Sequence, residues 1–241
     1  MKWAGGHAVV GEGKARIWGL IAESARSRGG PMSVRDVCTV CVRVLAADGA
    51  GVSLLNGDRL EPVQAEGALS RPLLEAELTT GDGPCVEAVA TGLPVAATDL
   101  GDARCRRRWP FFTATAYAGD IAAAFAFPLI SRMAPIGVLA ACRSRPGTLS
   151  AAAHRDALIL ADTAVTLLLT GQADAVPDDW LALGAEIHQA AGMVSVQLDC
   201  TVEQALARLR GHAFAHELPV TQVAKQVVER ILRFTPDTSR P

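Results

Sequence analysis

The sequence predicts an α+β protein in which an antiparallel sheet flanked by helices is followed by a C-terminal bundle of three helices. Apolar segments of strand length occur in pairs joined by short turns, at 49–66 and again at 121–144. Helical patterns stand before, between and after these pairs, which is typical of α+β domains. Beyond residue 180 only helical periodicity remains, so this part is expected to form a separate bundle.

Composition and charge exclude few functions. The chain has 241 residues, of which half are apolar and a fifth charged, with a net charge of −2. Such a balance gives no protein-wide positive field, so binding to nucleic acid or to an acidic membrane requires a local patch. The N-terminus lacks an apolar run long enough for a signal peptide, and the run "DIAAAFAFPLI" is too short to cross a membrane. We therefore expect a cytoplasmic protein without membrane contact.

The first half of the chain alternates helices and strands. Residues 1–32 form a leader with one short helix over 14–27, and a helix is predicted over 33–47. The strands "GAGVSLL" and "LEPVQAEG" flank Asn56-Gly57, a dipeptide that readily adopts the positive φ angles of a hairpin turn. A helix in "SRPLLEAELTTG", the segment "DGPCVEAVATG" and a strand in "LPVAATDL" follow.

The second half of the predicted sheet lies between a basic loop and a long helix. After "ARCRRRWPFF", the runs "IAAAFAFPLI" and "APIGVLAACRS" are expected to form the central hairpin. A helix over 150–169 follows, with Ser150 as its cap. The segment "GQADAVPDD" then interrupts the helical pattern and indicates a domain boundary.

Three short helices are predicted beyond this boundary. The first carries an apolar stripe over 187–198, and the second begins at Thr201, with Gln204 completing a capping box. The third opens at Pro219, and its apolar face is expected to reach Ile231. Because three short helices bury little surface, the bundle is expected to pack against the preceding helix or a second subunit.

Cysteines and histidines do not suggest a metal site. The six cysteines are scattered, and the single CxxC, Cys38 and Cys41, lies on a predicted helix face without a second ligand pair. These two thiols are interpreted as small buried apolar groups. His212 and His216 have the i, i+4 spacing of metal ligands, but the helix is expected to end between them, and no third ligand is apparent.

Two stretches of the chain resemble known families. Residues 33–170 resemble a GAF domain of the actinobacterial type through "GAGVSLL", "GDGPCVEAVATGLPVAATDL", "RWPFF" and "FAFPLISRMAPIGVLAACRS". Residues 184–234 resemble an ANTAR domain through "IHQAAGMVSVQLDCTVEQALARLRGHAF" and "LPVTQVAKQVVERI". The expected organisation is a leader at 1–32, a GAF domain at 33–170, a linker at 171–180, an ANTAR domain at 181–234 and a tail at 235–241.

The resemblance implies a transcription antitermination regulator. Its GAF domain would sense a small-molecule effector or mediate dimerisation, and its ANTAR domain would bind paired stem-loops in nascent messenger RNA, with a homodimer as the active form. It implies no catalysis and no cofactor. The motif positions matched in the two ANTAR helices are Ala190, Gly192, Met193, Ala205 and Leu209. Many ANTAR domains have a lysine before the motif glycine, and this chain has Ala191 there.

The candidate RNA-binding residues are Arg208, Arg210, His212 and Lys225. Arg208 and His212 are one turn apart on the expected outer side of the second helix, with Arg210 close by, so the three are expected to form one outward face. Guanidinium and imidazole planes can stack on the unpaired bases of an RNA loop. Acidic residues balance the cations of this region, so a solvated helix face is the alternative interpretation for each residue.

A pocket in the GAF domain is predicted around Cys85, Arg108 and Trp109. Cys85 follows a Gly-Pro turn and is interpreted as a structural or pocket-lining residue, although a helix N-terminus there would favour a thiolate. Two alternative functions remain open. One is a DNA-binding helical regulator, because the helices joined by "AHELPV" resemble a helix-turn-helix. The other is a GAF-type redox enzyme using Cys85, since some GAF-fold enzymes reduce free methionine sulfoxide.

Overall fold

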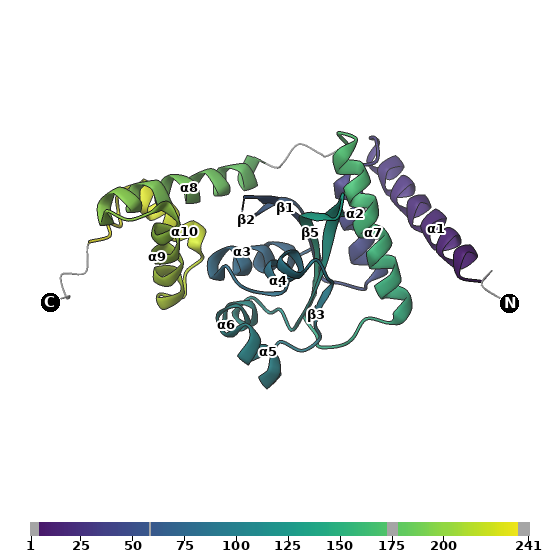
Figure 1. The fold of residues 1–241 in the computed structure, drawn as a ribbon, viewed down its shortest axis with the longest axis horizontal. Coiled ribbons are helices and arrows are strands. Elements are labelled where there is room, and N and C mark those ends of the chain that lie inside the picture. The colour runs from purple at the N-terminus through teal and green to yellow at the C-terminus, as the bar shows by residue number, and fades with distance from the viewer. Residues whose placement is uncertain (1–4, 58, 173–177, 236–241) are drawn as a thin grey trace.

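The predicted antiparallel sheet is confirmed. The structure, a computed structural model, describes residues 5–57, 59–172 and 178–235, so parts of the predicted leader, linker and tail lie outside the described residues (Figure 1). Its five strands follow the order β2-β1-β5-β4-β3, and every neighbouring pair is antiparallel. The strands are β1 (Gly49–Asn56), β2 (Arg59–Glu66), β3 (Val95–Ala97), β4 (Ala123–Ser131) and β5 (Ala134–Arg143).

Two tight hairpins define the register of this sheet. Asn56 pairs with Arg59 across the first hairpin, and Gly57 has the positive φ of 63° that the sequence predicts. In the second hairpin, Arg132 and Met133 both have positive φ, at 47° and 68°. Positive φ at both central positions matches the right-handed twist of the flanking strands, so this turn closes without a glycine.

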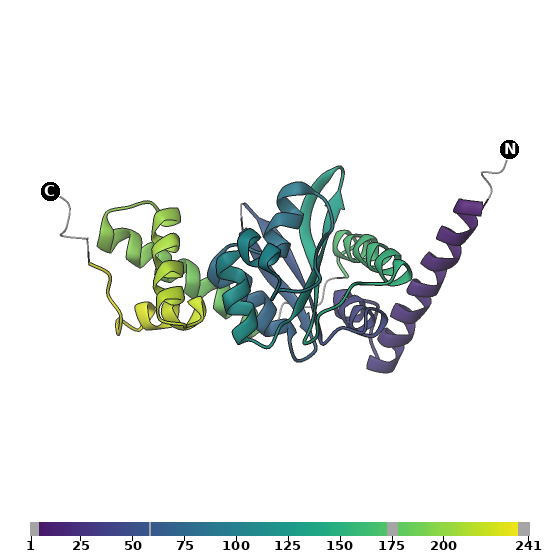
Figure 2. The same cartoon turned by 90° about the horizontal axis from the view of Figure 1, so that it is seen from below.

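Helices cover both faces of the sheet, as Figure 2 shows. One face carries α2 (Val34–Val44) and α7 (Ala151–Leu169), and α1 (Gly5–Arg28) packs against these two helices from outside. The other face carries α3 (Ser70–Thr80), α4 (Pro84–Thr91), α5 (Ala103–Arg108) and α6 (Pro110–Ala118). Strand β4 shows the alternation that this requires, with Phe125 and Phe127 in the first core and Ala124 and Ala126 in the second. The small alanines leave room for the second helical layer.

The N-terminal helix is longer than predicted and belongs to the first core. It spans Gly5–Arg28 instead of 14–27, and its Ile17 and Ile21 have no exposed surface. Arg28 forms an ion pair with Asp36 at 2.8 Å, and the Asp36 side chain is 1% exposed. Asp36 also accepts the Ser33 N–H at 3.0 Å, which completes the capping box of α2.

The predicted helical bundle is also present, at the end of the molecule opposite α1 (Figure 1). It comprises α8 (Asp178–Leu198), α9 (Val202–Ala215) and α10 (Val220–Val228), called the C-terminal bundle below. The capping box of α9 is confirmed, because the Thr201 and Gln204 side chains each accept the other's backbone N–H. The expectation that Ile231 is buried is wrong. Helix α10 ends at Val228, Arg230 has a φ of 62°, and Ile231 is 73% exposed.

Small residues bring the bundle helices together, but the motif glycine does not contribute. Ala190, Ala191 and Ala205 are fully buried in the bundle core. A Cβ added to Gly192, by contrast, would meet no atom within 4 Å. The packing of α8 at this run therefore depends on Ala190 and Ala191, and nothing in the described packing requires a glycine at 192.

The CxxC cysteines lie in the core. Cys38 and Cys41 have no exposed surface on α2, and burial raises the pKa of the Cys41 thiol to about 12.

Within the described ranges, no helix combines the length and apolar character needed to cross a lipid bilayer.

Candidate functional site

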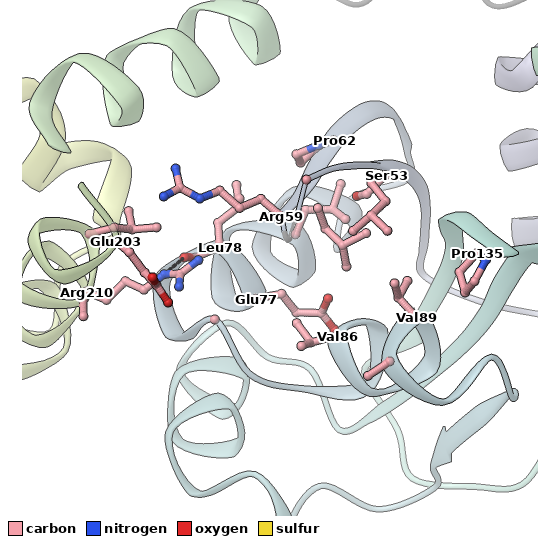
Figure 3. A pocket seen from close by; sticks show the side chains of 18 residues that line it. Ser53, Arg59, Pro62, Glu77, Leu78, Val86, Val89, Pro135, Glu203 and Arg210 are labelled. Atoms are coloured by element: carbon pink, nitrogen blue, oxygen red, sulfur yellow. Dashed lines mark hydrogen bonds between the residues drawn. The ribbon is translucent and has the colours of Figure 1, made fainter. Parts of the chain in front are cut away.

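A cavity of about 530 Å³ lies where the C-terminal bundle meets the sheet domain. Its walls come from the β1–β2 hairpin, from α3 and α4, and from α9 of the bundle, as Figure 3 shows. Most of its lining is aliphatic, including Leu60, Leu74, Val86 and Val89. Four charged side chains, those of Arg59, Glu77, Glu203 and Arg210, also line it. A cavity of this size, with aliphatic walls and a limited set of polar groups, has the character of a small-molecule site. It is called the junction cavity below.

Glu77 of α3 provides a carboxyl group to the junction cavity. The residue is only 7% exposed, and its Oε1 accepts the backbone N–H of Cys85 at 3.0 Å. Burial raises the pKa of Glu77 to about 7, with a further raising effect from the nearby Asp82, while the hydrogen bonds from Cys85 oppose it. Among the ion pairs of the described residues, none involves Glu77. The carboxyl therefore lies beside aliphatic side chains and has no ion-pair partner among the residues that the structure describes.

Helix α9 closes the other side of the cavity with Glu203, Leu206, Ala207 and Arg210. Arg210 is half-buried, and its Nε donates to the carbonyl oxygen of Leu78 at the end of α3, at 3.1 Å. The guanidinium lies close to Gly81, whose φ is 64° and where an added Cβ would come within 2.4 Å of it, so a larger residue there would displace the Arg210 side chain. Arg210 thus lies in the junction between the two parts of the chain.

Three further contacts join the bundle to the sheet domain. The backbone N–H of Val220 donates to Thr79 Oγ1 at 3.1 Å, and the rings of Phe111 and Phe214 meet edge to face with centroids 4.8 Å apart. On the hairpin side, His188 of α8 lies between Arg59 at 3.2 Å and Glu61 at 3.3 Å. The bundle thus contacts α3, α6 and β2 of the sheet domain.

The four predicted RNA-binding residues do not share one face. Arg210 turns towards α3, so the expectation that it faces outward with Arg208 and His212 is wrong. Arg208 and His212 do lie together, and they line a surface hollow with Phe234. Lys225 is exposed on α10 and forms an i, i+4 ion pair with Glu229 at 3.9 Å. The structure therefore assembles two of the four residues.

His212, which lines this hollow, stacks on His216 one turn later in the chain. The rings of His212 and His216 are 4.0 Å apart, and Phe234 approaches His212 edge to face at 5.4 Å. Burial, together with the neighbouring His216, lowers the pKa of His212. A neutral, stacked imidazole next to Arg208 offers a flat surface of the kind on which bases stack. Phe234, which sequence reasoning did not single out, is held there by its N–H to Gln197 Oε1 at 2.8 Å.

The three residues predicted for a GAF pocket lie near the junction cavity but do not line it. Arg108 and Trp109 both bond to Glu87 of α4: Arg108 Nε is 2.8 Å and Trp109 Nε1 3.2 Å from Glu87 Oε2. The Trp109 ring is 2% exposed in the second core. Cys85 is also 2% exposed, and its neighbour Val86 is the residue that faces the cavity. The bonds from Arg108 and Trp109 to Glu87 therefore connect α4 to the segment where α5 ends and α6 begins.

The environment of the Cys85 thiol does not favour reactivity. Burial raises its pKa well above the ordinary value, and the nearby Glu77 raises it further. A nucleophilic cysteine requires a lowered pKa and access to solvent. The helix N-terminus that the sequence suggests at Cys85 is present, since α4 begins at Pro84, but burial and Glu77 outweigh it.

Glu77 is the important residue that the sequence analysis missed, although a signal was present. In "PLLEAEL", Leu73 and Leu74 predict the apolar face of a helix, and Glu77 follows them by one turn on that same face. A charged residue on an apolar stripe indicates a buried charge that needs an explanation. The participation of α9, more than a hundred residues away, has no local signal.

Comparison with known proteins gives one family. The sequence model of the GAF domain matches residues 34–168. No curated protein matches the chain.

Several solved structures are similar in fold. The GAF domain of an Acinetobacter phosphoenolpyruvate-protein phosphotransferase is 15% identical, with a TM-score of 0.48 over 68% of this chain and 94% of that one. Its counterpart from Coxiella burnetii is 11% identical, with a TM-score of 0.48 over 66% and 95%. A type II free methionine-R-sulfoxide reductase from Thermoplasma acidophilum is 17% identical, with a TM-score of 0.43 over 64% and 98%. At these identities no ligand or activity is carried over.

Proposed function

The chain belongs to the GAF domain family, and from this premise we propose that it is a signal-responsive transcription regulator of the cytoplasm. In this proposal the GAF domain senses a small molecule, and the C-terminal bundle binds stem-loops in nascent transcripts as an ANTAR domain does. The protein acts as a homodimer and catalyses no reaction. The raised pKa of the buried Cys85 thiol supports this over a redox enzyme.

The hollow on α9 is the observation that carries the RNA-binding part of the proposal. Arg208, His212 and Phe234 surround it, and this combines one cation with two flat rings. RNA loops are recognised by such groups, because unpaired bases stack on aromatic rings and guanidinium planes. Ala190, Ala205 and Leu209, which match ANTAR motif positions, are fully buried and so fit a role in building the bundle.

The charge of the bundle predicts how the RNA would be held. Residues 181–234 carry equal numbers of basic and acidic side chains that offset one another, so few phosphates can be neutralised. Affinity would then come mainly from stacking, and it would depend on salt less steeply than that of a basic RNA-binding domain. A weak salt dependence is therefore a signature of this proposal.

The test compares binding of the full chain to a two-hairpin RNA and to duplex DNA at fixed salt. Phe234→Ala is expected to weaken RNA binding about tenfold, in the range measured for loss of one base stack, and Arg208→Ala several-fold. Arg155→Ala, which removes an exposed cation from α7, is the matched control and should have no effect.

Two outcomes contradict the proposal. If duplex DNA binds more tightly than the two-hairpin RNA, the DNA-binding alternative is favoured. If Arg208→Ala and Phe234→Ala bind the RNA as the unsubstituted chain does, the hollow is not the contact surface.

A further inference from the structure

We propose that the junction cavity is a binding site for a small amine with an apolar body, that the GAF domain and the C-terminal bundle share this site, and that its occupancy fixes helix α9. The site deepens the sensing role proposed above. Its consequence for RNA binding rests on that proposed function, whereas the amine site itself does not.

The charge of Glu77 determines the ligand class. The carboxyl lies in a wall of Leu74, Val86 and Val89, and within the described part of the chain no lysine or arginine pairs with it. An ionised carboxylate accepts several hydrogen bonds, and the Cys85 backbone N–H at 3.0 Å provides only part of them. A protonated amine supplies both the missing donors and the missing counter-charge. The aliphatic side chains next to Glu77 favour an apolar body for the remainder of the ligand.

The arginines of the cavity do not supply that counter-charge. Figure 3 shows Arg59 and Arg210 towards the bundle side, while Glu77 lies beside Val86. Arg210 donates to the Leu78 carbonyl, and Arg59 contacts His188. Both guanidinium groups therefore serve the junction between the two parts of the chain.

The bundle makes the site complete. Leu206 and Ala207 of α9 form the wall that faces the hairpin and α3. A ligand that contacts Glu77 and this wall together gains contacts from α9 only while the bundle is docked. Binding therefore favours the docked arrangement in proportion to those contacts. Ala207 also lines the hollow of Arg208 and His212, so the same short segment of α9 borders both sites.

The experiment uses the full chain and 2-phenylethylamine as the probe, with 2-phenylethanol and 3-phenylpropionate as its neutral and anionic counterparts. Calorimetry at pH 7.5 is expected to show binding of the amine and at least tenfold weaker binding of the other two. Glu77→Gln should weaken amine binding at least tenfold. Glu75→Gln, a substitution on the same helix but outside the cavity lining, is the matched control and should leave binding unchanged.

A second variant keeps the test valid if Glu77→Gln does not fold. Ala90 is exposed and lines the cavity from α4, so Ala90→Phe should fill the space and abolish binding while leaving the Glu77 carboxyl in place. Hydrogen exchange then reports on the shared wall. The amine is expected to slow exchange of backbone amides in both 70–80 and 202–215.

Each part of the proposal has its own refutation. Equal binding of the amine by the unsubstituted chain and by Glu77→Gln, or equal binding of 3-phenylpropionate, overturns the ligand class. Amine binding that leaves exchange over 202–215 unchanged overturns the shared wall. Hairpin RNA is titrated in the same samples. If the amine binds and protects α9 but the unsubstituted chain does not bind the hairpin RNA, the proposed RNA function fails. The shared amine site is then unaffected.

Discussion

Glu77→Gln should change how the stability of the protein depends on pH. The buried Glu77 has a pKa of about 7 in the folded protein, against an ordinary value of 4.5. Its folded-state pKa is raised, so the stabilising contribution of the neutral carboxyl is fully present below pH 4.5. That contribution is lost as the pH rises through about 7. Glutamine keeps an oxygen for the Cys85 N–H and does not ionise.

The magnitude follows from these two pKa values. Each pH unit between them is worth about 1.4 kcal/mol, so ionising Glu77 in the folded state costs about 3 kcal/mol by pH 8. Because domains of this kind are stable by only about 5–15 kcal/mol, the effect is a large share of the total. The unsubstituted chain and Glu77→Gln should therefore be similarly stable at pH 5, and the variant should be about 3 kcal/mol more stable at pH 8.

Urea denaturation of both proteins at pH 5, 6, 7 and 8 measures this difference directly. Glu75→Gln is the control, because Glu75 is on the same helix and is only partly buried. Burial raises the pKa of its carboxyl as well, but the ion pair with Arg71 at 3.2 Å opposes that rise. Its stability difference should vary much less with pH. A Glu77→Gln difference that stays constant from pH 5 to 8, or that falls, would refute the assignment of Glu77 as a buried carboxyl without a cation.

Three further substitutions test the packing. Gly192→Ala should raise the free energy of unfolding by about 1 kcal/mol in a thermal melt, because the helix gains alanine's propensity and the new Cβ meets no atom within 4 Å; a loss of stability would show an unrecognised close contact. Asp36→Ala should lower the free energy of unfolding, measured by urea denaturation, by about 3 kcal/mol, because it removes the carboxylate that pairs with Arg28 at 2.8 Å. A decrease of less than about 1 kcal/mol would contradict this role of Asp36. Gly137→Ala should lower the free energy of unfolding by about 2 kcal/mol in the same assay, because the new Cβ would be 2.3 Å from the carbonyl oxygen of Ser53. Unchanged stability would contradict the close spacing of β1 and β5 at this point.

The sheet was predictable because its signals are local. The Asn56-Gly57 turn, the paired apolar runs and the cap at Ser150 each depend on a few neighbouring residues, and the structure has all three. The N-terminal helix was underestimated for the opposite reason. Ile17 and Ile21 are buried only because α2 and α7 lie beside them, and a short pattern surrounded by glycines does not reveal such partners.

The error on Arg210 could have been avoided from the sequence. Consecutive residues of an α-helix are separated by about 100°, so Arg208 and His212 lie within about 40° of each other, whereas Arg210 is about 200° from Arg208. Helical geometry therefore already separates Arg210 from the other two. What geometry alone does not give is the identity of its partner, the Leu78 carbonyl, which belongs to a helix 132 residues earlier in the chain.

This separation decides which variants are informative about RNA. Arg210→Ala removes a hydrogen bond to α3 and part of the cavity wall, so a loss of RNA binding in that variant has two explanations, direct contact and displaced docking. Arg208 lines the outer hollow and is not among the residues that line the junction cavity, so Arg208→Ala leaves the cavity wall intact. If the two variants weaken RNA binding equally and the amine probe restores only Arg210→Ala, the loss in that variant comes from docking. If the amine restores neither, although calorimetry shows that it still binds Arg210→Ala, displaced docking does not explain the loss and Arg210 contributes to the RNA surface itself.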